Sequence, residues 1–382
     1  MAHIVHVVTV PETLFFFRGQ GAHFRSRGHT VSAVASPGDA LHDFAREEGV
    51  EVHPVSMTRS ITPVPDLVSL VRLVRLFRRI RPDVVHGHTP KGGLLGMMAA
   101  ALAGVPLRVY HVHGLRLATE TGLKRKVLAG TERLAGALAH HVLPVSGSVR
   151  DAVVEDRLAP GEKVRVLGAG SINGVDAERH FRPERWEADG LALRRRLDIA
   201  PDAPILGFVG RLVREKGLDE LARAWTEIRE RVPDAHFLLV GPFEPQDPPS
   251  PETVRLLKED PRVHLVGRDR NIRPYYAAMD VVALPSHREG YPVVVLEASA
   301  MELPVVATRV QGCVDAVVEG GTGRLVSRGD VDGLARALES YLRQPALREE
   351  HGRRARERVL AEYRPGDLWE AMENLYTHEG AR

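Results

Sequence analysis

Short runs of apolar, mainly β-branched residues alternate with longer segments of helical periodicity along the first half of the chain. A continuous apolar run bounded by turn residues is typical of a strand that is buried on both faces of a parallel sheet. Segments such as 66–80 and 94–103 have the periodicity of helices. The strands expected in this half are Ile4–Val10, Val31–Ala35, Val84–His86, Arg108–His111 and His141–Val145.

The alternation is interrupted between about Gly168 and Pro204 and then begins again. The interruption carries the sequence GAGSINGVD, a charged stretch and two prolines. Repeated strand–helix–strand units imply an open α/β sheet with right-handed crossovers, so the pattern predicts two doubly wound α/β domains in tandem. The strands expected after the interruption are Ile205–Val209, His236–Val240, Val263–Val266, Val281–Pro285, Pro304–Ala307 and Leu325–Val326.

These breaks predict the domain organisation. We expect a Rossmann-like domain over residues 1–170, a linker region over 171–203 and a second Rossmann-like domain over 204–364. Residues 365–382 would form a C-terminal helix that packs back on the first domain. Sheets of this kind bind ligands at the carboxyl ends of their strands, so we expect the two domains to face a central cleft.

Composition narrows the class of protein. The 382 residues are 43% apolar and 27% charged, which excludes a fibrous or disordered chain. The net charge of +2, from 52 basic and 50 acidic residues, gives no field that would attract nucleic acid, and no nucleic-acid partner is expected. Cys313 is the only cysteine, which rules out an intramolecular disulfide and a cysteine-rich zinc site.

The sequence also bears on location. Met1–Val10 has no basic leader, and the apolar stretch 93–107 is shorter than the ~20 residues that a membrane-spanning helix needs. The segment Pro65–Pro82 combines leucine and valine at helical spacing with several arginines. It could lie on an anionic membrane surface or form a core-packed helix with a hydrated basic face. We expect a cytoplasmic protein, with peripheral contact to the inner face of the cell membrane left open.

A cationic segment follows the first strand of the second domain. Gly210–Gly217 has the sequence GRLVREKG and lies between strand 205–209 and a helix that begins near Leu218. Arg211 and Lys216 placed before a helix N-terminus suit a phosphate group, although two hydrated surface cations would give the same pattern. The segment is not a P-loop, because the order G-x-x-x-x-G-K-[ST] is absent.

Two glutamates follow a later strand of the same domain. Glu289 lies in the loop after strand 281–285, and Glu297 lies about one turn into the next helix. A carboxylate only accepts hydrogen bonds, so it suits the paired hydroxyl groups of a ribose or a hexose. The spacing can arise by chance, but the position after a sheet strand favours a ligand site.

Histidines gather in the first domain. His86 and His88 form one H-x-H pair, and His111 and His113 form another, so each pair would lie on one face of a strand. Such pairs could hold a metal ion, but no acidic ligand is near, and a histidine hydrogen-bonded in the core is the alternative. His113, which follows a strand and precedes Gly114, is the best placed for a functional role.

Taken together, these segments resemble glycosyltransferase family 4, whose members are retaining enzymes of the GT-B fold. The most specific parts are G-R-x-x-x-x-K-G at Gly210–Gly217 and Glu-x7-Glu at Glu289–Glu297. Asn173–Asp176 is similar to the N-G-V-D of the family. Residues 88–100 and 109–116 look like a branch that assembles bacterial surface polysaccharides and glycoconjugates.

The resemblance implies roles for individual residues. Arg211 and Lys216 would hold the diphosphate of a nucleotide-sugar donor, Glu297 would bind the ribose, and Glu289 would face the donor sugar. His113 would contact that sugar or the transferred proton, so the resemblance implies His113, Arg211, Lys216 and Glu289 as the catalytic set. Further donor contacts are implied for Gly19, Gly210, Gly290, Tyr291, Pro292 and Val293.

The expected activity is that of a retaining glycosyltransferase that moves a sugar from a UDP-hexose or UDP-N-acetylhexosamine to a saccharide, lipid-linked or small-molecule hydroxyl. Fixed cations beside the diphosphate can stabilise the charge that develops as it leaves. No cofactor is expected, and no metal, because the chain has no obvious carboxylate motif to hold one. Two alternatives stay open, namely a UDP-sugar 2-epimerase of the same fold and a non-catalytic nucleotide-sugar-binding protein.

Overall fold

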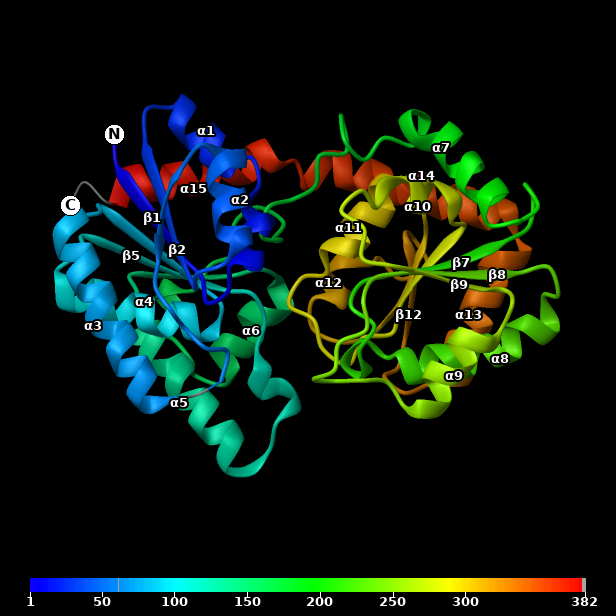
Figure 1. Cartoon of the computed structure of the whole chain (residues 1–382), viewed down its shortest axis with the longest axis horizontal. Coiled ribbons are helices and arrows are strands. Elements are labelled where there is room, and N and C mark those ends of the chain that lie inside the picture. The colour runs from blue at the N-terminus through cyan, green and yellow to red at the C-terminus, as the bar shows by residue number, and fades with distance from the viewer. Residues whose placement is uncertain (61, 380–382) are drawn as a thin grey trace. The chain divides into compact units, whose positions relative to one another are not determined.

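Two parallel six-stranded sheets organise the computed structural model, which describes residues 1–60 and 62–379 (Figure 1). The chain divides into two compact units. Unit 1 comprises Met1–Asn173 and the chain from Pro365 on, and unit 2 comprises Gly174–Arg364. The α/β class and the doubly wound parallel sheets expected from the sequence are confirmed.

The sheet of unit 1 has the strand order β3-β2-β1-β4-β5-β6, and every neighbouring pair is parallel. This order places β1 and β4 side by side at the centre, and His6 of β1 lies opposite His86 of β4. The strands are β1 (His3–Val7), β2 (Thr30–Ala35), β3 (Glu51–Pro54), β4 (Val84–His88), β5 (Leu107–Val112) and β6 (His141–Pro144). The sequence did not predict the edge strand β3, because EVHP is short, half polar and ends in proline.

Helices cover both faces of this sheet. Those on one face include α3 (Pro63–Ile80), α4 (Pro90–Ala103) and α5 (Gly122–Leu138), with α4 packed against both of the others. On the opposite face α1 contacts both α2 and α15 (Figure 1). The remaining helical segments of the unit are η1 (Pro11–Phe17), α1 (Gln20–Ser26), α2 (Asp39–Glu48), η2 (Arg116–Thr119), α6 (Gly147–Glu155), η3 (Gly161–Lys163) and α15 (Pro365–Glu379).

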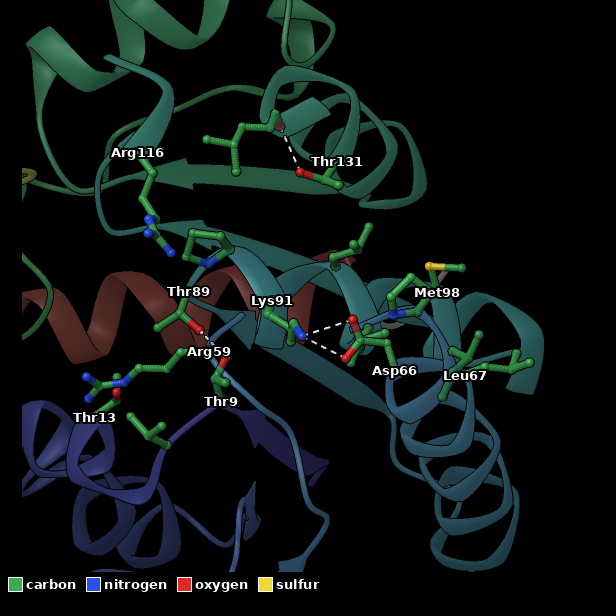
Figure 2. A pocket seen from close by; sticks show the side chains of 17 residues that line it. Thr9, Thr13, Arg59, Asp66, Leu67, Thr89, Lys91, Met98, Arg116 and Thr131 are labelled. Atoms are coloured by element: carbon green, nitrogen blue, oxygen red, sulfur yellow. Dashed lines mark hydrogen bonds and ion pairs between the residues drawn. The ribbon is translucent and has the colours of Figure 1, made fainter. Parts of the chain in front are cut away.

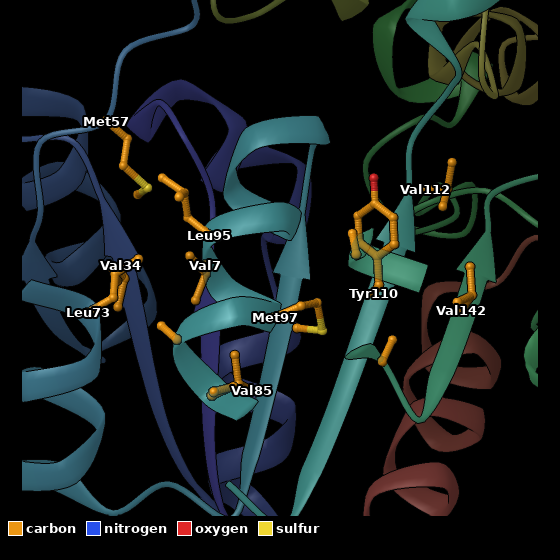
Figure 3. Close-up of a cluster of buried hydrophobic side chains, with 14 of the residues drawn as sticks. Val7, Val34, Met57, Leu73, Val85, Leu95, Met97, Tyr110, Val112 and Val142 are labelled. Carbon is orange, nitrogen blue, oxygen red and sulfur yellow. The ribbon is translucent and has the colours of Figure 1, made fainter. Parts of the chain in front are cut away.

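The core of unit 1 fills the space between the sheet and the α3–α5 layer (Figure 3). Val7, Val85 and Tyr110 come from β1, β4 and β5, and Met97 of α4 is fully buried with them. Strands with both faces covered need apolar side chains on both faces, which explains why their sequences are continuous apolar runs. The core therefore fixes the positions of the strand ends, where the polar side chains described below begin.

The C-terminal helix α15 belongs to unit 1. The indole Nε1 of Trp369 donates to Asn173 Oδ1 at 2.6 Å, and the Tyr376 hydroxyl hydrogen-bonds to His86 Nδ1 at 2.6 Å. Tyr376 is almost fully buried, so it ties α15 to the centre of the sheet.

The sheet of unit 2 repeats the same topology with the order β12-β11-β10-β7-β8-β9. Its central pair is β7 and β10, with Leu206 opposite Val281. Both strands are fully buried, in agreement with their uninterrupted apolar sequences. The strands are β7 (Ile205–Val209), β8 (His236–Val240), β9 (Val263–Gly267), β10 (Val281–Leu284), β11 (Val305–Thr308) and β12 (Gly323–Val326).

The helices of unit 2 include one in the segment 171–203, which the sequence indicated as a linker region. This helix, α7, packs closely against α10, and a Cβ at Gly190 would lie 2.7 Å from the Ala277 carbonyl oxygen. Unit 2 accordingly starts at Gly174. The helical segments of the unit are α7 (Pro183–Arg196), η4 (Arg214–Lys216), α8 (Leu218–Arg231), α9 (Pro251–Glu259), α10 (Arg273–Ala278), α11 (Val293–Ala300), α12 (Cys313–Ala316), α13 (Val331–Arg343) and α14 (Pro345–Glu362).

Within the described residues, no helix has both the length and the apolar character that crossing a membrane requires.

Candidate functional site

The site of unit 2 lies where the chain leaves its two central strands. The segment Gly210–Gly217 follows β7, and the segment 285–292 follows β10. Neighbouring parallel strands end at the same edge of a sheet, so these two segments start side by side. One leads to α8 and the other to α11, which makes this edge the topological switch point where open α/β sheets bind ligands.

Gly217 allows the two segments to touch. Its φ of +74° is in the left-handed region, and a Cβ at this position would lie 2.0 Å from the Pro285 carbonyl oxygen. A side chain would therefore both strain the backbone and force the segments apart. The glycine that ends the GRLVREKG motif thus allows the Lys216 cation and the Glu289 carboxylate to approach each other.

Lys216 and Glu289 meet at this contact, with 2.5 Å between Nζ and Oε1. Their side chains are 20% and 10% exposed, so most of the water around both charges has been displaced. A partly buried charge is stable when it has an opposite partner, and removal of either partner leaves the other uncompensated. An ammonium has three N–H donors, so Lys216 can bind an anionic ligand while it still donates to Glu289.

Arg211 has a different partner. Its guanidinium forms an ion pair with Glu244 at 2.8 Å, and its side chain is 45% exposed. The structure therefore joins Lys216 to Glu289 directly but does not join Arg211 to either of them. A guanidinium that is half exposed can exchange its carboxylate for phosphate oxygens at small cost, because exposed ion pairs contribute little stability.

Glu297 lies on α11, one turn from its start, as the sequence indicated. The Tyr276 hydroxyl donates to its Oε2 at 2.9 Å. Burial raises the pKa of Glu297 to about 7, against the opposing effects of the Tyr276 hydrogen bond and the charge of Arg273. The carboxyl group is therefore near half-ionised at neutral pH and still has acceptor capacity beyond the bond to Tyr276.

The segment between the two glutamates can supply backbone donors. The carbonyl oxygen of Gly290 lies 2.1 Å from where a Cβ at Gly312 would be, so this stretch is held close to α12. Pro292 precedes the first residue of α11, Val293, and has no N–H. No described residue accepts from the N–H of Tyr291 or Val293.

Gly210 has φ +147°, and its N–H donates to the Val240 carbonyl at 2.9 Å. That N–H is consequently used within the sheet edge. Gly210 shapes the start of the cationic segment, because its carbonyl oxygen closely approaches Gly241.

Unit 1 carries five histidines at the carboxyl ends of its central strands. His6 Nδ1 lies 3.0 Å from His88 Nε2, and His88 Nδ1 lies 3.1 Å from His113 Nε2, which makes a chain of three hydrogen-bonded rings. His86 and His111 stack with their ring centroids 5.2 Å apart. The H-x-H pairs and strand register thus bring together four of these residues, and β1 adds His6, which the sequence analysis missed.

Burial keeps this cluster uncharged. It lowers the pKa of His6 to about 4 and that of His113 to about 3. The pKa values of His86, His88 and His111 are also well below the usual range, because burial and then the neighbouring histidines disfavour a positive charge. At neutral pH each ring is therefore both a donor and an acceptor.

Neutral imidazoles are also metal ligands. Two triads, His6–His86–His88 and His88–His111–His113, have ligand nitrogens within 4.8 Å of one another. His86 Nε2 and His111 Nδ1 have no hydrogen-bond partner among the described residues. The absence of a metal, which we expected from the sequence, stays a prediction.

Gly19 has another environment than the sequence suggested. It precedes α1 with φ +87°, and its N–H donates to Glu48 Oε1 at 2.8 Å. A Cβ here would lie 2.5 Å from the indole ring of Trp369. In this structure the glycine accommodates the C-terminal helix, and its N–H is not open to a phosphate.

Sequence reasoning missed His6 and Tyr276 for different reasons. His6 lies three residues after His3 in the first strand and belongs to no H-x-H pair. Only the pairing of β1 with β4 shows that it meets His86 and His88. Tyr276 lies in RPYYAA, where nothing distinguishes it from core. Its contact with Glu297 depends on the packing of α10 and α11.

Fold and site define a class: a two-unit, doubly wound α/β protein whose second unit presents a cation and carboxylates at its switch point. Residues 203–344 match the family described as glycosyl transferases group 1, and residues 16–170 match the glycosyl transferase 4-like domain. The capsular polysaccharide biosynthesis glycosyltransferase CapM of Staphylococcus aureus is 33% identical over 374 residues, which cover 98% of this chain and 96% of CapM.

Two further proteins extend this comparison. The UDP-Gal:α-D-GlcNAc-diphosphoundecaprenol α-1,3-galactosyltransferase of Escherichia coli is 29% identical over 311 residues, which cover 81% of this chain and 79% of the relative. Anabaena HepE, crystallised in complex with UDP and glucose, is 20% identical with a TM-score of 0.80, and the alignment covers 98% of this chain and 99% of HepE. The chain therefore belongs to the group 1 glycosyltransferases, glycosyltransferase family 4, and is a glycosyltransferase of the GT-B fold. The family, the fold and the enzyme class expected from the sequence are confirmed.

The histidine cluster predicts acid sensitivity of unit 1. A histidine whose pKa is about 4 when folded and ~6.5 when unfolded binds its proton more tightly in the unfolded chain, so stability falls as pH drops through 6.5 towards 4. We expect His6 alone to lower the free energy of unfolding by about 2 kcal/mol between pH 7.5 and pH 5. Urea denaturation at both pH values, followed by Trp369 fluorescence with Trp186 and Trp225 replaced by Phe, measures this difference.

The variant His6→Phe should lose about 2 kcal/mol of that pH dependence, because it has no proton to bind. The variant His42→Gln changes an exposed histidine of α2 outside the cluster and should retain it. Equal stability at the two pH values would show that the buried rings are not held neutral.

Proposed function

We propose that the chain transfers a hexose or N-acetylhexosamine from a UDP-sugar to a hydroxyl group, with retention of the anomeric configuration. The observation that carries the proposal is the Lys216–Glu289 contact at the switch point of unit 2. In this proposal the Lys216 ammonium stands beside the departing diphosphate, and the Glu289 carboxylate accepts hydrogen bonds from the sugar hydroxyls. The family membership supplies the reaction class.

UDP as the nucleotide is supported by the relatives. Anabaena HepE has been crystallised with UDP-glucose, and the E. coli relative uses UDP-Gal according to its name. In this chain the buried carboxyl group of Glu297, which already accepts a hydrogen bond from Tyr276, would also accept hydrogen bonds from the ribose hydroxyls. Arg211 would hold the diphosphate after exchanging its contact with Glu244.

The chemistry follows from where charge develops. When the anomeric C–O bond breaks, the electron pair stays with the diphosphate, and the sugar gains positive character. The ammonium of Lys216 and the guanidinium of Arg211 stabilise the new negative charge, and the N–H groups of Tyr291 and Val293 add neutral donors. The leaving phosphate oxygen then accepts the proton of the attacking hydroxyl group.

This scheme assigns no step to a metal ion, because the two cations can supply the charge stabilisation. His113 stays a proposed contact of the transferred sugar. It is the outermost ring of the cluster, half-buried, and hydrogen-bonded to His88. A neutral imidazole can orient a sugar hydroxyl without placing a second positive charge beside a developing oxocarbenium ion.

The acceptor is proposed to be a lipid-linked saccharide, with a free saccharide or small molecule as the other cases. The name of the E. coli relative describes a diphosphoundecaprenol-linked acceptor, and CapM is named for capsular polysaccharide biosynthesis. Exposed apolar and basic side chains on α3 support a lipid acceptor. Such an acceptor would make peripheral membrane contact part of the proposal.

The central experiment incubates the enzyme with each UDP-sugar in turn, with and without an N-acetylglucosaminyl diphospholipid, and analyses products by mass spectrometry. We expect one sugar to be transferred only when acceptor is present, and the rate to be unchanged by EDTA. The anomeric configuration of the product, read by NMR, should match that of the donor. An isomerised UDP-sugar formed without acceptor would instead identify an epimerase, and binding without any turnover would identify a sensor.

Lys216→Ala should lower kcat by about 10²- to 10³-fold, the usual effect of losing one donor that stabilises developing charge. The matched control is Arg214→Ala. Arg214 is two residues away and 58% exposed, and its nearest carboxylate, on Asp219, is 3.8 Å distant. We expect this control to have the wild-type rate. Circular dichroism would establish that both variants are folded, and a wild-type rate for folded Lys216→Ala would refute the assignment.

Donor affinity should depend on the ionisation of Glu297. Its pKa of about 7 means that the carboxylate, the form that accepts two ribose hydroxyls, is lost as pH falls below 7. We expect the Kd of UDP-glucose to rise about tenfold between pH 8 and pH 6, since only the ionised fraction binds. Both phosphates of UDP-glucose are esterified and do not titrate in this range, so calorimetry reports the protein.

The variant Glu297→Gln should bind UDP-glucose with a Kd that is nearly constant between pH 6 and pH 8. A wild-type Kd that is itself constant over this range would argue against Glu297 as the ribose ligand.

A further inference from the structure

Unit 1 contains a cavity of about 490 Å³ at the carboxyl ends of its own central strands (Figure 2). Thr9 and Thr13 follow β1, and Thr89 and Lys91 follow β4. The cavity therefore lies at the switch point of unit 1, the place where open α/β sheets bind ligands. Its volume is within the ~300–1,000 Å³ typical of small-molecule sites.

One side of the cavity is cationic. In Figure 2, Arg59 and Arg116 lie on the same side as Thr89 and Thr13. Both arginines are exposed, and neither has an acidic partner among the described residues. The N-terminus of α4, which begins at Pro90, adds the positive end of a 14-residue helix.

The only carboxylate that lines the cavity within the described residues is already neutralised. Asp66 is 2.7 Å from Lys91 Nζ, and both side chains are mostly buried. Burial would raise the pKa of Asp66, but its hydrogen bonds to Lys91 and Thr62 lower it overall, so the pair stays ionised. The two arginines therefore give this side an uncompensated charge, which suits a ligand with more than one negative charge, such as a diphosphate.

The other side is apolar. Leu67 and Met98 lie across the cavity from the arginines, with the Lys91–Asp66 pair between (Figure 2). The apolar lining comes from α3, α4 and α5, and consists of Leu67, Leu70, Leu94, Leu95, Met98 and Leu128. This wall has no charge to offer and suits a hydrocarbon chain joined to the anionic group.

The apolar character continues onto the outer surface of α3 and α5. Val64, Leu67, Val68 and Val71 are between 41% and 75% exposed, and their i, i+3, i+4, i+7 spacing forms one stripe along α3. On α5, Leu123 and Val127 are exposed on either side of basic residues. Exposed apolar stripes beside lysine and arginine are typical of a surface that rests on an anionic bilayer.

We propose that this cavity binds the isoprenoid diphosphate of a lipid-linked saccharide, a proposal that rests on the function proposed above. Arg59 and Arg116 hold the diphosphate, and the apolar wall takes the first isoprene units. The rest of the isoprenoid tail remains in the bilayer, and the apolar stripe on α3 lies against the bilayer surface. A charged head joined to a hydrocarbon is the one ligand that uses both sides of the cavity.

The test measures binding of three probes by calorimetry, with the same low concentration of a detergent in every cell: farnesyl diphosphate, inorganic diphosphate and farnesol. Saturating UDP is present so that the cations of unit 2 are occupied, and UDP binding is measured separately. We expect farnesyl diphosphate to bind at least about tenfold more tightly than either half alone, because only it engages both sides.

Two variants and two matched controls locate the probe. Arg116→Gln and Leu67→Glu each change an exposed side chain on opposite sides of the cavity, and each should weaken farnesyl diphosphate binding about tenfold. The controls are Arg46→Gln, on α2, and Leu102→Glu, at the far end of α4, both exposed and outside the cavity. Both controls should bind farnesyl diphosphate with the wild-type affinity. All four variants should bind UDP with the wild-type affinity.

Each other result overturns either the cavity proposal or the proposed donor. If inorganic diphosphate binds as tightly as farnesyl diphosphate, the apolar wall does not contribute to binding. If farnesol binds as tightly as farnesyl diphosphate, the two arginines do not contribute. Binding that is lost in Lys216→Ala rather than in Arg116→Gln would place the probe in unit 2. If UDP binds and farnesyl diphosphate does not, the cavity proposal fails while the donor site stands. If UDP does not bind and farnesyl diphosphate behaves as expected, the proposed donor fails instead.

Discussion

In both units the site depends on one constraint, the adjacency of two parallel strands whose following segments run to opposite faces of the sheet. In unit 1 these strands are β1 and β4, and in unit 2 they are β7 and β10. The helices that follow diverge from the gap between the strand ends, so polar side chains can gather there next to strands that are buried in the core. The apolar core holds the strands in place, and the strand ends position the functional side chains. Few further residues are therefore needed to hold the site together.

The same topology carries opposite electrostatics in the two units. Unit 2 keeps ionised groups at its strand ends, because Lys216 and Glu289 compensate each other. Unit 1 places five imidazoles in an equivalent position and buries them, and the loss of water keeps them neutral. A cation that is paired with a carboxylate can bind an anionic ligand in place of that carboxylate. A chain of neutral imidazole rings can instead take up protons at low pH or form hydrogen bonds with neutral groups. The fold does not distinguish these outcomes, and the side chains at the strand ends do.

How far the sequence could predict this structure follows from the range of each interaction. The two sheets and the positions of Lys216, Glu289 and Glu297 relative to strands and helices depend on local patterns, and the sequence indicated them. The Lys216–Glu289 contact was not derivable, because it depends on the approach of Gly217 to Pro285 across the sheet edge. The helix α7 was hidden by its charged composition, since its packing on α10 is a tertiary contact that no local pattern indicates. His6, Tyr276 and the environment of Gly19 also needed the tertiary structure, because each is defined by a partner far away in the chain.

Gly19 shows why a motif alone does not assign a role. A glycine before the first helix of a doubly wound domain is compatible with close approach of a phosphate, and also with close approach of any other bulky group. Here the group is the indole of Trp369, and the N–H that a phosphate would need is bound to Glu48. The C-terminal helix thus occupies the space that the first glycine loop could have offered, and its Tyr376 reaches the histidine cluster from the same side of the sheet. On the other face of the sheet, the cavity of unit 1 is lined by residues of α3, α4 and α5, and the exposed apolar stripe also lies on α3.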